Sequence, residues 1–552
     1  MIFRRVGFLS RVRSPGKYWY FLGFCLVGVL GYWLAGTAMP EPEVRQASAV
    51  TSGPAMAKIQ PDEPPVRFRK EDRATDFRGD EEATRAGALP GQRVLAFKDA
   101  AALQRFLDRA GDKIRLLGRL DALNALRVGF LNPADLAALL DGDEESSLIF
   151  PVDVPSPGDG SAQTGAVPLG AGLLDWLGIS GDHSAWGSGV RIAVLDTGVA
   201  AHSAFGSAIS MLNFIDLPSD LSLQNGHGTA VASVIIGQDP LTPGVAPGAE
   251  IVSIRIANDL GQSDSFLLAR GIVAAVDSGA QLINISMGSF GDSALVRSAI
   301  EYARSAGTLI VAAAGNNGLE RVTYPAASDG VLAVGAVDAL GNHLNFSNTG
   351  SQIAIAAPGF GVNAAWPGDQ AASVNGTSFS SPIVTGAIAA LMSRPGAAKL
   401  TAQQAADLLF SHLNDGGEAG SDTALGGGMP DLGRVLNAST PGIYDAAVAS
   451  QRILPPGPGH PYGQIEILVQ NRGTERLVNT SVRISTPVGT VTSNITHLDV
   501  NAVHTVRVPI PQATATSMRY DSRVMLSDGR RDAKPSNDRR VEVYVPADAM
   551  SE

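Results

Sequence analysis

The chain has one cysteine in 552 residues, Cys25, and only 17% of its residues are charged. A single thiol forms no intramolecular disulfide and cannot build a zinc site from several thiolates. Because Cys25 lies in a hydrophobic N-terminal segment, a thiol enzyme is excluded as well. The net charge of −11 argues against nucleic-acid binding as the main role.

The length and the apolar content limit the number of domains and the size of their cores. A chain of 552 residues is expected to hold more than one domain, and a hydrophobic content of 45% is ample for large cores.

The N-terminus indicates export. Residues 1–17 contain five basic and no acidic side chains, and residues 18–39 are uncharged and mainly apolar, long enough to cross a bilayer. Aromatic residues near both ends of 18–39 favour a membrane anchor with 1–17 in the cytoplasm. A cleaved signal peptide is the alternative, with Gly36 and Ala38 as small residues before a cleavage site. Either way the rest of the chain works outside the cytoplasm, at the cell surface or in a periplasm, or secreted.

The next two stretches differ in character. Residues 40–91 are rich in proline and mixed charge and predict a flexible linker. Residues 92–152 predict a small α+β domain with the order β-α-β-β-α-β, in which Leu103, Phe106 and Ala110 lie on one helix face. Asn132 and Pro133 are typical of the cap and first residue of the second helix.

Three short segments supply the side chains of activated-serine chemistry. Val190–Leu195 is a nearly continuous apolar run, which predicts a buried parallel strand with Asp196 at its carboxyl end. His227 lies between two glycines and begins a helix of small residues. Ser378 opens a helix over 378–392, where the positive end of the helix dipole favours a developing oxyanion. A serine hydroxyl becomes a nucleophile when an imidazole takes its proton and a carboxylate orients that imidazole.

A fourth segment has the pattern of a buried strand followed by a turn. Residues 309–314 are apolar, and Gly315-Asn316-Asn317-Gly318 follows them. Glycine and asparagine are common in turns, so taken alone this run predicts only a turn.

With these four segments in this order, the chain resembles the subtilisin-type serine proteases over about residues 170–438. The resemblance implies that Asp196 orients His227, that His227 takes the proton of Ser378, and that the Asn316 amide donates to the oxyanion. It also implies two segments that bind an extended peptide between them as an added strand. Those segments contribute Ser286, Met287 and Gly288 on one side and Ile256, Ala257, Asn258 and Gly261 on the other.

The chain departs from the family pattern at several positions. Ala230 and Ser233 stand where the family usually has a second histidine and a glycine, and both are packing positions. Phe205 stands near the place of a calcium-binding aspartate, and the stretch 237–247 is short for the usual calcium loop. We therefore expect no calcium site of that kind, and we predict no metal and no cofactor.

The resemblance also orders the domains. Residues 92–152 are similar to the family's inhibitory propeptide, although an unrelated α+β module is the alternative. Residues 153–168 are then the linker with the self-cleavage region, and 169–438 the α/β peptidase domain with three layers and a mainly parallel sheet. After a second linker over 439–462, alternating apolar residues over 463–546 predict an all-β immunoglobulin-like sandwich.

The sequence thus predicts an exported serine endopeptidase made as a self-inhibited zymogen, whose partners are polypeptide substrates, its own propeptide and a membrane through residues 18–39. One alternative is a catalytically silent protein that only binds peptides. Another is a processing protease dedicated to one exported partner.

Overall fold

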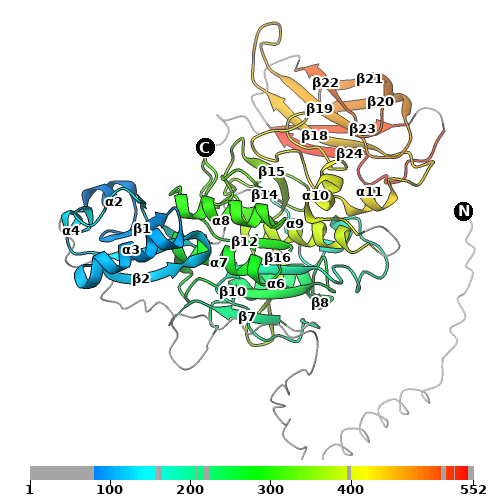
Figure 1. Ribbon diagram of the computed structural model, residues 1–552. Helices are drawn as coiled ribbons and strands as arrows, with labels where there is room; N and C mark the ends of the chain where they lie inside the picture. The colour runs from blue at the N-terminus through cyan, green and yellow to red at the C-terminus, as the bar shows by residue number, and fades with distance from the viewer. Residues whose placement is uncertain are drawn as a thin grey trace, which may run out of the picture. The chain divides into compact units, whose positions relative to one another are not determined.

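The computed structural model describes residues 80–156, 158, 165–206, 209–215, 223–394, 399–510, 517–526 and 529–544. The basic segment 1–17 and the hydrophobic segment 18–39 lie outside this range. Within it, the structure contains no helix with the length and apolarity needed to span a bilayer. Figure 1 follows the described chain from an α+β unit in blue, through a larger α/β domain in green and yellow, to strands in orange and red.

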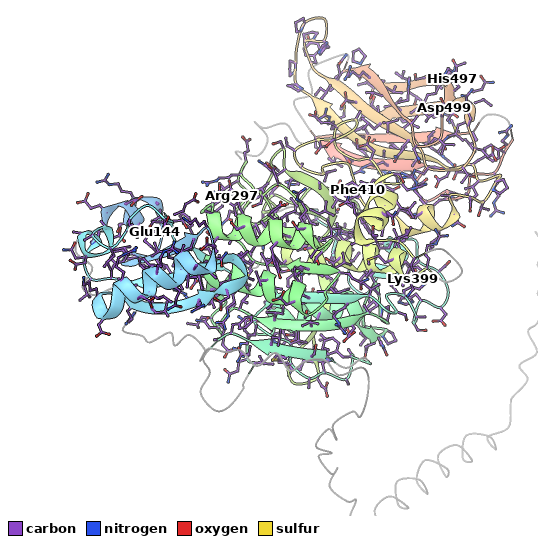
Figure 2. The ribbon with its side chains drawn as sticks, in the orientation of Figure 1. Glu144, Arg297, Lys399, Phe410, His497 and Asp499 are labelled. Carbon is purple, nitrogen blue, oxygen red and sulfur yellow. The ribbon has the colours of Figure 1, made fainter. Side chains whose placement is uncertain are left out.

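The first unit is a four-stranded antiparallel sheet with the strand order β2-β3-β1-β4. Helix α3 (Ala100–Ala110) begins at Asp99, whose side chain accepts from the Ala102 N–H, and it buries Leu103 and Phe106 against the sheet. Figure 2 labels Glu144, on the edge strand. The remaining elements of the unit are β1 (Gln92–Phe97), β2 (Arg115–Leu120), β3 (Ala125–Gly129), α4 (Pro133–Ala137) and β4 (Glu144–Ser147), followed by β5 (Pro151–Asp153).

Helix α2 (Glu81–Ala86) differs from the prediction of a flexible linker over 40–91. Asp80 caps this helix, and its carboxylate accepts from both terminal nitrogens of Arg93 at 2.7 Å. The Gly91 N–H donates to the same carboxylate at 2.9 Å. This buried ion pair fixes the helix to β1, so the ordered unit extends at least to residue 80.

The larger α/β domain is built on seven parallel strands in the order β15-β14-β13-β12-β6-β10-β7. Their runs of valine, isoleucine, leucine and alanine suit a sheet that is covered on both faces. The strands are β6 (Arg191–Asp196), β7 (Ile209–Asn213), β10 (Glu250–Arg255), β12 (Leu282–Ile285), β13 (Leu309–Ala313), β14 (Val331–Val337) and β15 (Ile353–Pro358).

Alternate residues of β6 enter two separate cores, which shows that helices cover both faces of the sheet. Ile192 and Val194 pack with α6 (His227–Ile236) and α9 (Thr377–Met392), whereas Ala193 and Leu195 pack with α7 (Ser265–Asp277) and α8 (Ala294–Ser305). The predicted α/β domain with a mainly parallel sheet is confirmed. Smaller elements complete it: α5 (Leu173–Trp176), β8 (Gln238–Asp239), β9 (Thr242–Pro243), β11 (Gln262–Asp264), β16 (Val362–Trp366), β17 (Gln370–Val374), α10 (Ala402–Phe410) and α11 (Leu432–Asn437).

The C-terminal strands form two antiparallel sheets, in the orders β18-β19-β22 and β21-β20-β23-β24, around one apolar core. Strand β18 lies inside the stretch 439–462, for which the sequence predicts only a linker. Its first residues are small and buried, so they pair with β19 without the large apolar signature of the other strands. The strands are β18 (Ala446–Leu454), β19 (Gln464–Asn471), β20 (Leu477–Thr486), β21 (Gly489–Leu498), β22 (Val503–Pro509), β23 (Met518–Met525) and β24 (Arg539–Tyr544).

Arg434 of α11 connects these strands to the larger α/β domain. One of its terminal nitrogens donates to the Leu413 carbonyl at 2.7 Å and to the His412 carbonyl at 3.0 Å, and its Nε donates to the Arg472 carbonyl at 3.3 Å. The other terminal nitrogen donates to Asn501 in the turn before β22. Burial lowers the pKa of Arg434 to about 10. A buried guanidinium of this kind donates to several carbonyls at once and fixes their positions.

Candidate active site

Asp196 and His227 form a buried pair at the carboxyl end of the sheet. His227 Nδ1 lies 2.9 Å from Asp196 Oδ1 and 3.0 Å from Oδ2. Asp196 is fully buried and His227 is 8% exposed. A carboxylate in this position fixes the imidazole tautomer that keeps Nε2 available as a base.

Backbone and side-chain contacts orient both members of the pair. The Thr197 N–H donates to Asp196 Oδ1 at 2.7 Å. The His227 N–H donates to Asn225 Oδ1 at 3.0 Å, and the Gly228 N–H donates to Thr197 Oγ1 at 3.2 Å. The start of α6 is therefore held directly against the end of β6.

Ser378 lies in the first turn of α9, and its hydroxyl bonds to a main-chain carbonyl rather than to the histidine. Ser378 Oγ donates to the Ser286 carbonyl at 3.1 Å. His227 Nε2 is buried and has no hydrogen-bond partner. The serine and the imidazole are therefore not hydrogen-bonded to each other in this structure.

The Asn316 side chain is held so that its amide nitrogen faces the cleft. Asn316 Oδ1 accepts from the Thr377 N–H at 2.9 Å and from Thr377 Oγ1 at 2.8 Å. Its Nδ2 donates to the Ser156 carbonyl at 3.1 Å. A Cβ at Gly376, where φ is 140°, would lie 2.7 Å from this Nδ2, so only glycine fits there.

The cleft itself is filled by residues 151–156, which follow the small α+β unit. Strand β5 pairs with β11 in antiparallel register, and Asp153 exchanges two hydrogen bonds of 3.1 Å with Gly288. The Val154 N–H donates to the Gly261 carbonyl at 2.8 Å. We call residues 151–156 the tail.

The predicted binding residues divide into two groups. Gly288 and Gly261 contact the tail, and the Ser286 carbonyl points to the serine hydroxyl. Asn258 does not pair with the tail: its side chain accepts from the Leu260 and Gln262 N–H groups and shapes the turn. The other three predicted residues, Ile256, Ala257 and Met287, are fully buried under the cleft.

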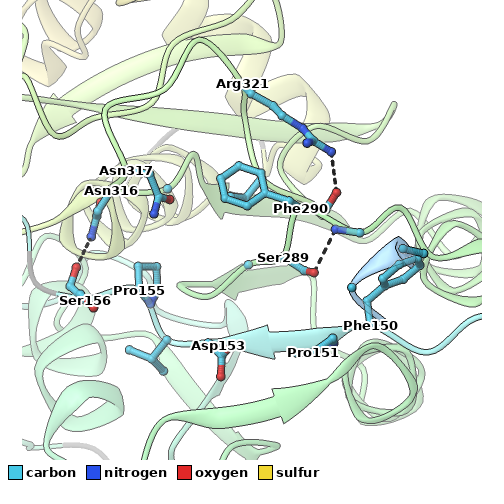
Figure 3. Close-up of a pocket in the computed structure, with 17 residues that line it drawn as sticks. Phe150, Pro151, Asp153, Pro155, Ser156, Ser289, Phe290, Asn316, Asn317 and Arg321 are labelled. Atoms are coloured by element: carbon cyan, nitrogen blue, oxygen red, sulfur yellow. Dashed lines mark hydrogen bonds between the residues drawn. The ribbon is translucent and has the colours of Figure 1, made fainter. Parts of the chain in front are cut away.

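A pocket of about 650 Å³ opens beside the tail (Figure 3). Phe290 and Arg321 form one wall, with the Arg321 guanidinium 5.1 Å from the Phe290 ring centre and donating to the Phe290 carbonyl at 2.7 Å. Asn316 and Asn317 lie on the opposite side (Figure 3). Sequence analysis did not identify Phe290 or Arg321, because neither belongs to a motif with a chemical role of its own.

A fully buried arginine supports the cleft from below. Arg255 donates to Asp259 Oδ1 at 3.0 Å, and Asn225 Nδ2 donates to the Asp259 carbonyl at 3.2 Å. Because Asn225 also accepts from the His227 N–H, this chain of contacts joins the turn over 258–261 to the histidine. Burial lowers the pKa of Arg255.

The described part of the chain contains no cluster of metal-ligating side chains. None of the His, Cys, Asp and Glu side chains in this part come together in a group of three that could hold an ion.

Comparison with known proteins identifies relatives of this chain. Residues 187–428 match the model of the Subtilase family. The thermostable alkaline protease of Halalkalibacterium halodurans is 36% identical over 252 residues, which are 45% of this chain and 68% of that protein. Subtilisin Savinase of Lederbergia lenta is 39% identical over 207 residues, 37% of this chain and 76% of that protein.

The chain belongs to the subtilase family. The resemblance inferred from the motifs is confirmed, and the protein is a subtilisin-like serine protease, a hydrolase of peptide bonds. In a solved structure, the epidermin leader peptide processing serine protease of Staphylococcus aureus, the same fold covers 64% of the subtilase and 99% of that chain, with a TM-score of 0.52 and 20% identity.

Proposed function

We propose that the subtilase is a serine endopeptidase made as a self-inhibited zymogen, in which the small α+β unit is the propeptide. One observation carries the proposal: the tail that follows this unit lies in the cleft, and its Ser156 carbonyl accepts from the Asn316 amide. An extended segment bound as an added strand blocks the same backbone groups that a substrate would use.

In the proposed reaction, Ser378 Oγ attacks the carbonyl carbon of the scissile bond while His227 Nε2 takes the hydroxyl proton. Asp196 stabilises the imidazolium that forms. The carbonyl electrons move to oxygen, and the Asn316 amide and the Ser378 N–H stabilise that oxyanion.

The tetrahedral intermediate then collapses. The carbon–nitrogen bond breaks, the leaving amine takes the proton from His227, and an ester joins the acyl group to Ser378. Water attacks this ester with His227 again as the base, which releases a carboxylate and restores the serine. No metal or cofactor is needed for any of these steps.

The contact between the propeptide and the peptidase domain supports inhibition that outlasts cleavage. Arg127 of β3 donates to Asp264 Oδ2 at 2.8 Å, and both side chains are buried. Asp264 also caps α7, because its Oδ1 accepts from the Phe266 and Leu267 N–H groups. A propeptide held in this way stays bound after its tail is cut.

We further propose that the enzyme acts outside the cytoplasm. The support is the sequence of residues 1–39, a basic segment followed by an apolar one, which indicates either a membrane anchor or a cleaved signal. The C-terminal sheets would then be a spacer or binding domain on the exported side.

The test of the zymogen is the intact mass of the full-length chain, wild type beside Ser378→Ala. Self-cleavage of the wild type within residues 153–168, with the variant whole, would support the triad and the propeptide together. If both chains stay whole, labelling of Ser378 by a fluorophosphonate would indicate an active enzyme matured by another protease. No labelling at all would support the silent peptide-binding protein instead.

A further inference from the structure

Three arginines lie in one row across the outer face of the β21-β20-β23-β24 sheet, whose strands can be followed in Figure 1. Arg483 of β20 stands opposite Arg523 of β23, and Arg523 stands opposite Arg539 of the edge strand β24. Thr492 of β21 stands opposite Arg483 and completes the row. Opposite residues on neighbouring antiparallel strands have their Cβ atoms about 5 Å apart. The row therefore places three guanidinium groups side by side.

The alternation of burial along the strands shows that the row faces solvent. On β20, the exposed Arg483 lies between the buried Val482 and Ile484. On β23, the exposed Arg523 lies between two buried residues in the same way. The apolar core between the two C-terminal sheets is on the opposite face. The arginine side chains are thus open to a ligand.

The same face carries an excess of positive charge on a chain whose net charge is −11. Arg519 lies beside the row on β23, so four arginines share the face with one acidic side chain of that strand, Asp521. Asp521 accepts from Arg539 Nε at 2.9 Å. In the part of the chain that the structure describes, Arg483, Arg519 and Arg523 form no ion pair. Three guanidinium groups are therefore left without a counter-charge.

An anion along the row would relieve a repulsion that the sheet otherwise retains. Like charges directly opposite on neighbouring strands destabilise a sheet. The planar guanidinium group matches the geometry of a carboxylate and forms charge-assisted hydrogen bonds with it. The row therefore favours a ligand that carries several negative charges in a line.

The side chains beside the row indicate sugar hydroxyl groups as the other part of the ligand. Strand β21 presents Thr490, Thr492 and Asn494 on this face, and all three are exposed. Their hydroxyl and amide groups both donate and accept hydrogen bonds, as the hydroxyls of a sugar do. The outward residues of β20, β21 and β23 include no Phe, Tyr or Trp on which a nucleic-acid base could stack.

We propose that the outer face of this sheet binds a linear acidic polysaccharide, whose carboxylates lie along Arg483, Arg523 and Arg539. The hydroxyls of its sugar rings bond to the polar side chains of β21. The C-terminal strands then hold the protease on an anionic glycan. This binding goes beyond the protease activity and does not depend on it.

The first experiment measures binding of fluorescein-labelled polygalacturonate by fluorescence anisotropy. The full-length chain carries Ser378→Ala, so that it stays whole, and is kept in detergent. Arg523→Gln, in the middle of the row, should weaken binding about fivefold. Arg476→Gln is the matched control, because this exposed arginine just before β20 already pairs with Asp499, and it should leave the affinity unchanged. Equal affinities of the two variants would overturn the proposal.

The unfolding temperature of the same samples distinguishes a binding role from a structural one. Arg523→Gln removes two like-charge contacts, so its unfolding temperature should equal or exceed that of the parent. A lower unfolding temperature together with weaker binding would make Arg523 a residue that stabilises the sheet, and would overturn its role in binding.

The second experiment tests the chemistry of the ligand. Methyl-esterified polygalacturonate has the same backbone without the charges, and it should not displace the labelled polymer. Thr492→Val should weaken binding about threefold, because a sugar hydroxyl loses its partner. Duplex DNA, or micelles containing phosphatidylglycerol, that displaced the polymer at a lower concentration of charge than unlabelled polygalacturonate would overturn the polysaccharide in favour of a nucleic acid or a membrane.

Discussion

Arg127 and Asp264 form an ion pair between two parts of the chain that lie 137 residues apart, with their side chains only 4% and 1% exposed. Removing one partner of such a pair leaves a buried charge without compensation, at a cost of roughly 3–5 kcal/mol. The Arg127 guanidinium also lies 5.9 Å from the Phe266 ring centre, on the first turn of α7.

The first prediction is that Arg127→Met weakens the hold on the cleaved propeptide by about 100-fold or more. Size exclusion of the self-cleaved chain should show the N-terminal fragment separating from the variant enzyme but not from the wild type. Arg105→Met is the control, since its pair with Asp143 is exposed and lies within the small unit. Equal retention of the fragment in all three proteins would contradict the prediction.

The second prediction concerns Thr377, which orients the Asn316 amide. Thr377→Val removes the 2.8 Å hydrogen bond to Asn316 Oδ1. The Asn316 amide then rotates more freely, and its hydrogen bond to the oxyanion becomes weaker. We expect kcat to fall by about 10- to 100-fold with KM nearly unchanged, less than the 100- to 1,000-fold typical of losing the donor itself. Thr377→Ser keeps the hydroxyl and should restore kcat, whereas a purely packing role would leave both variants impaired.

A third prediction is a pH dependence in the C-terminal strands. Burial, together with repulsion from Asp532 and Asp445, raises the pKa of Asp538 to about 6, above the ordinary aspartate value of 3.8. The folded state therefore binds a proton more tightly than the unfolded chain. Its stabilising contribution is complete below pH 3.8 and is lost as the pH rises through 6.

Asp538→Asn should thus slow hydrogen exchange of β23 and β24 at pH 7.5 and have little effect at pH 4. Asp521→Asn is the matched control with the opposite sign, because a hydrogen bond from Arg539 lowers the pKa of Asp521. That variant should exchange faster at pH 7.5. Identical pH profiles for both variants would exclude the proposed titration.

The fourth prediction is that Arg434→Lys loosens the C-terminal strands from the peptidase domain. One ammonium group cannot reach the carbonyls of His412, Leu413 and Arg472 together with Asn501, and each buried acceptor left without a donor costs about 1–3 kcal/mol. Limited proteolysis by an added protease, in the Ser378→Ala background, should cut the variant between residues 438 and 446 while the parent stays intact. Equal resistance of the two proteins would argue against this role.

A fifth prediction concerns substrate preference. Arg321 on the pocket wall should favour peptides with glutamate over lysine at the position bound there. Because the side chain is exposed, we expect Arg321→Gln to reduce that ratio of kcat/KM by only about two- to fivefold. Arg304→Gln, an exposed arginine paired with Glu301 on α8, should leave the ratio unchanged.

The parts of the fold that the sequence predicts are those with long buried runs. Strands β6 and β13 and helices α6 and α9 lie within two residues of the expected bounds, because their apolar patterns have no competing interpretation. The sequence predicts only linkers where strand β18 and helix α2 lie. The first consists of small residues, and the second is stabilised by the ion pair between Asp80 and Arg93, which no local pattern reveals.

In the candidate active site too, the sequence predicts the residues that lie in motifs but not the contacts between distant segments. Asp196, His227, Asn316 and Ser378 each lie in a short motif, so their proximity follows from the ends of neighbouring strands and helices. The contact between the Ser378 hydroxyl and the Ser286 carbonyl joins segments that lie 92 residues apart. Long-range pairing of that kind leaves no trace in either segment alone.

The pairing of β5 with β11 bears on how readily the chain aggregates. Once the tail leaves, β11 presents unpaired N–H and C=O groups along an exposed edge, and such an edge is a template for aggregation. While β5 is bound, it covers this edge. A tight-binding peptide added at the moment of maturation should do the same in a storage buffer.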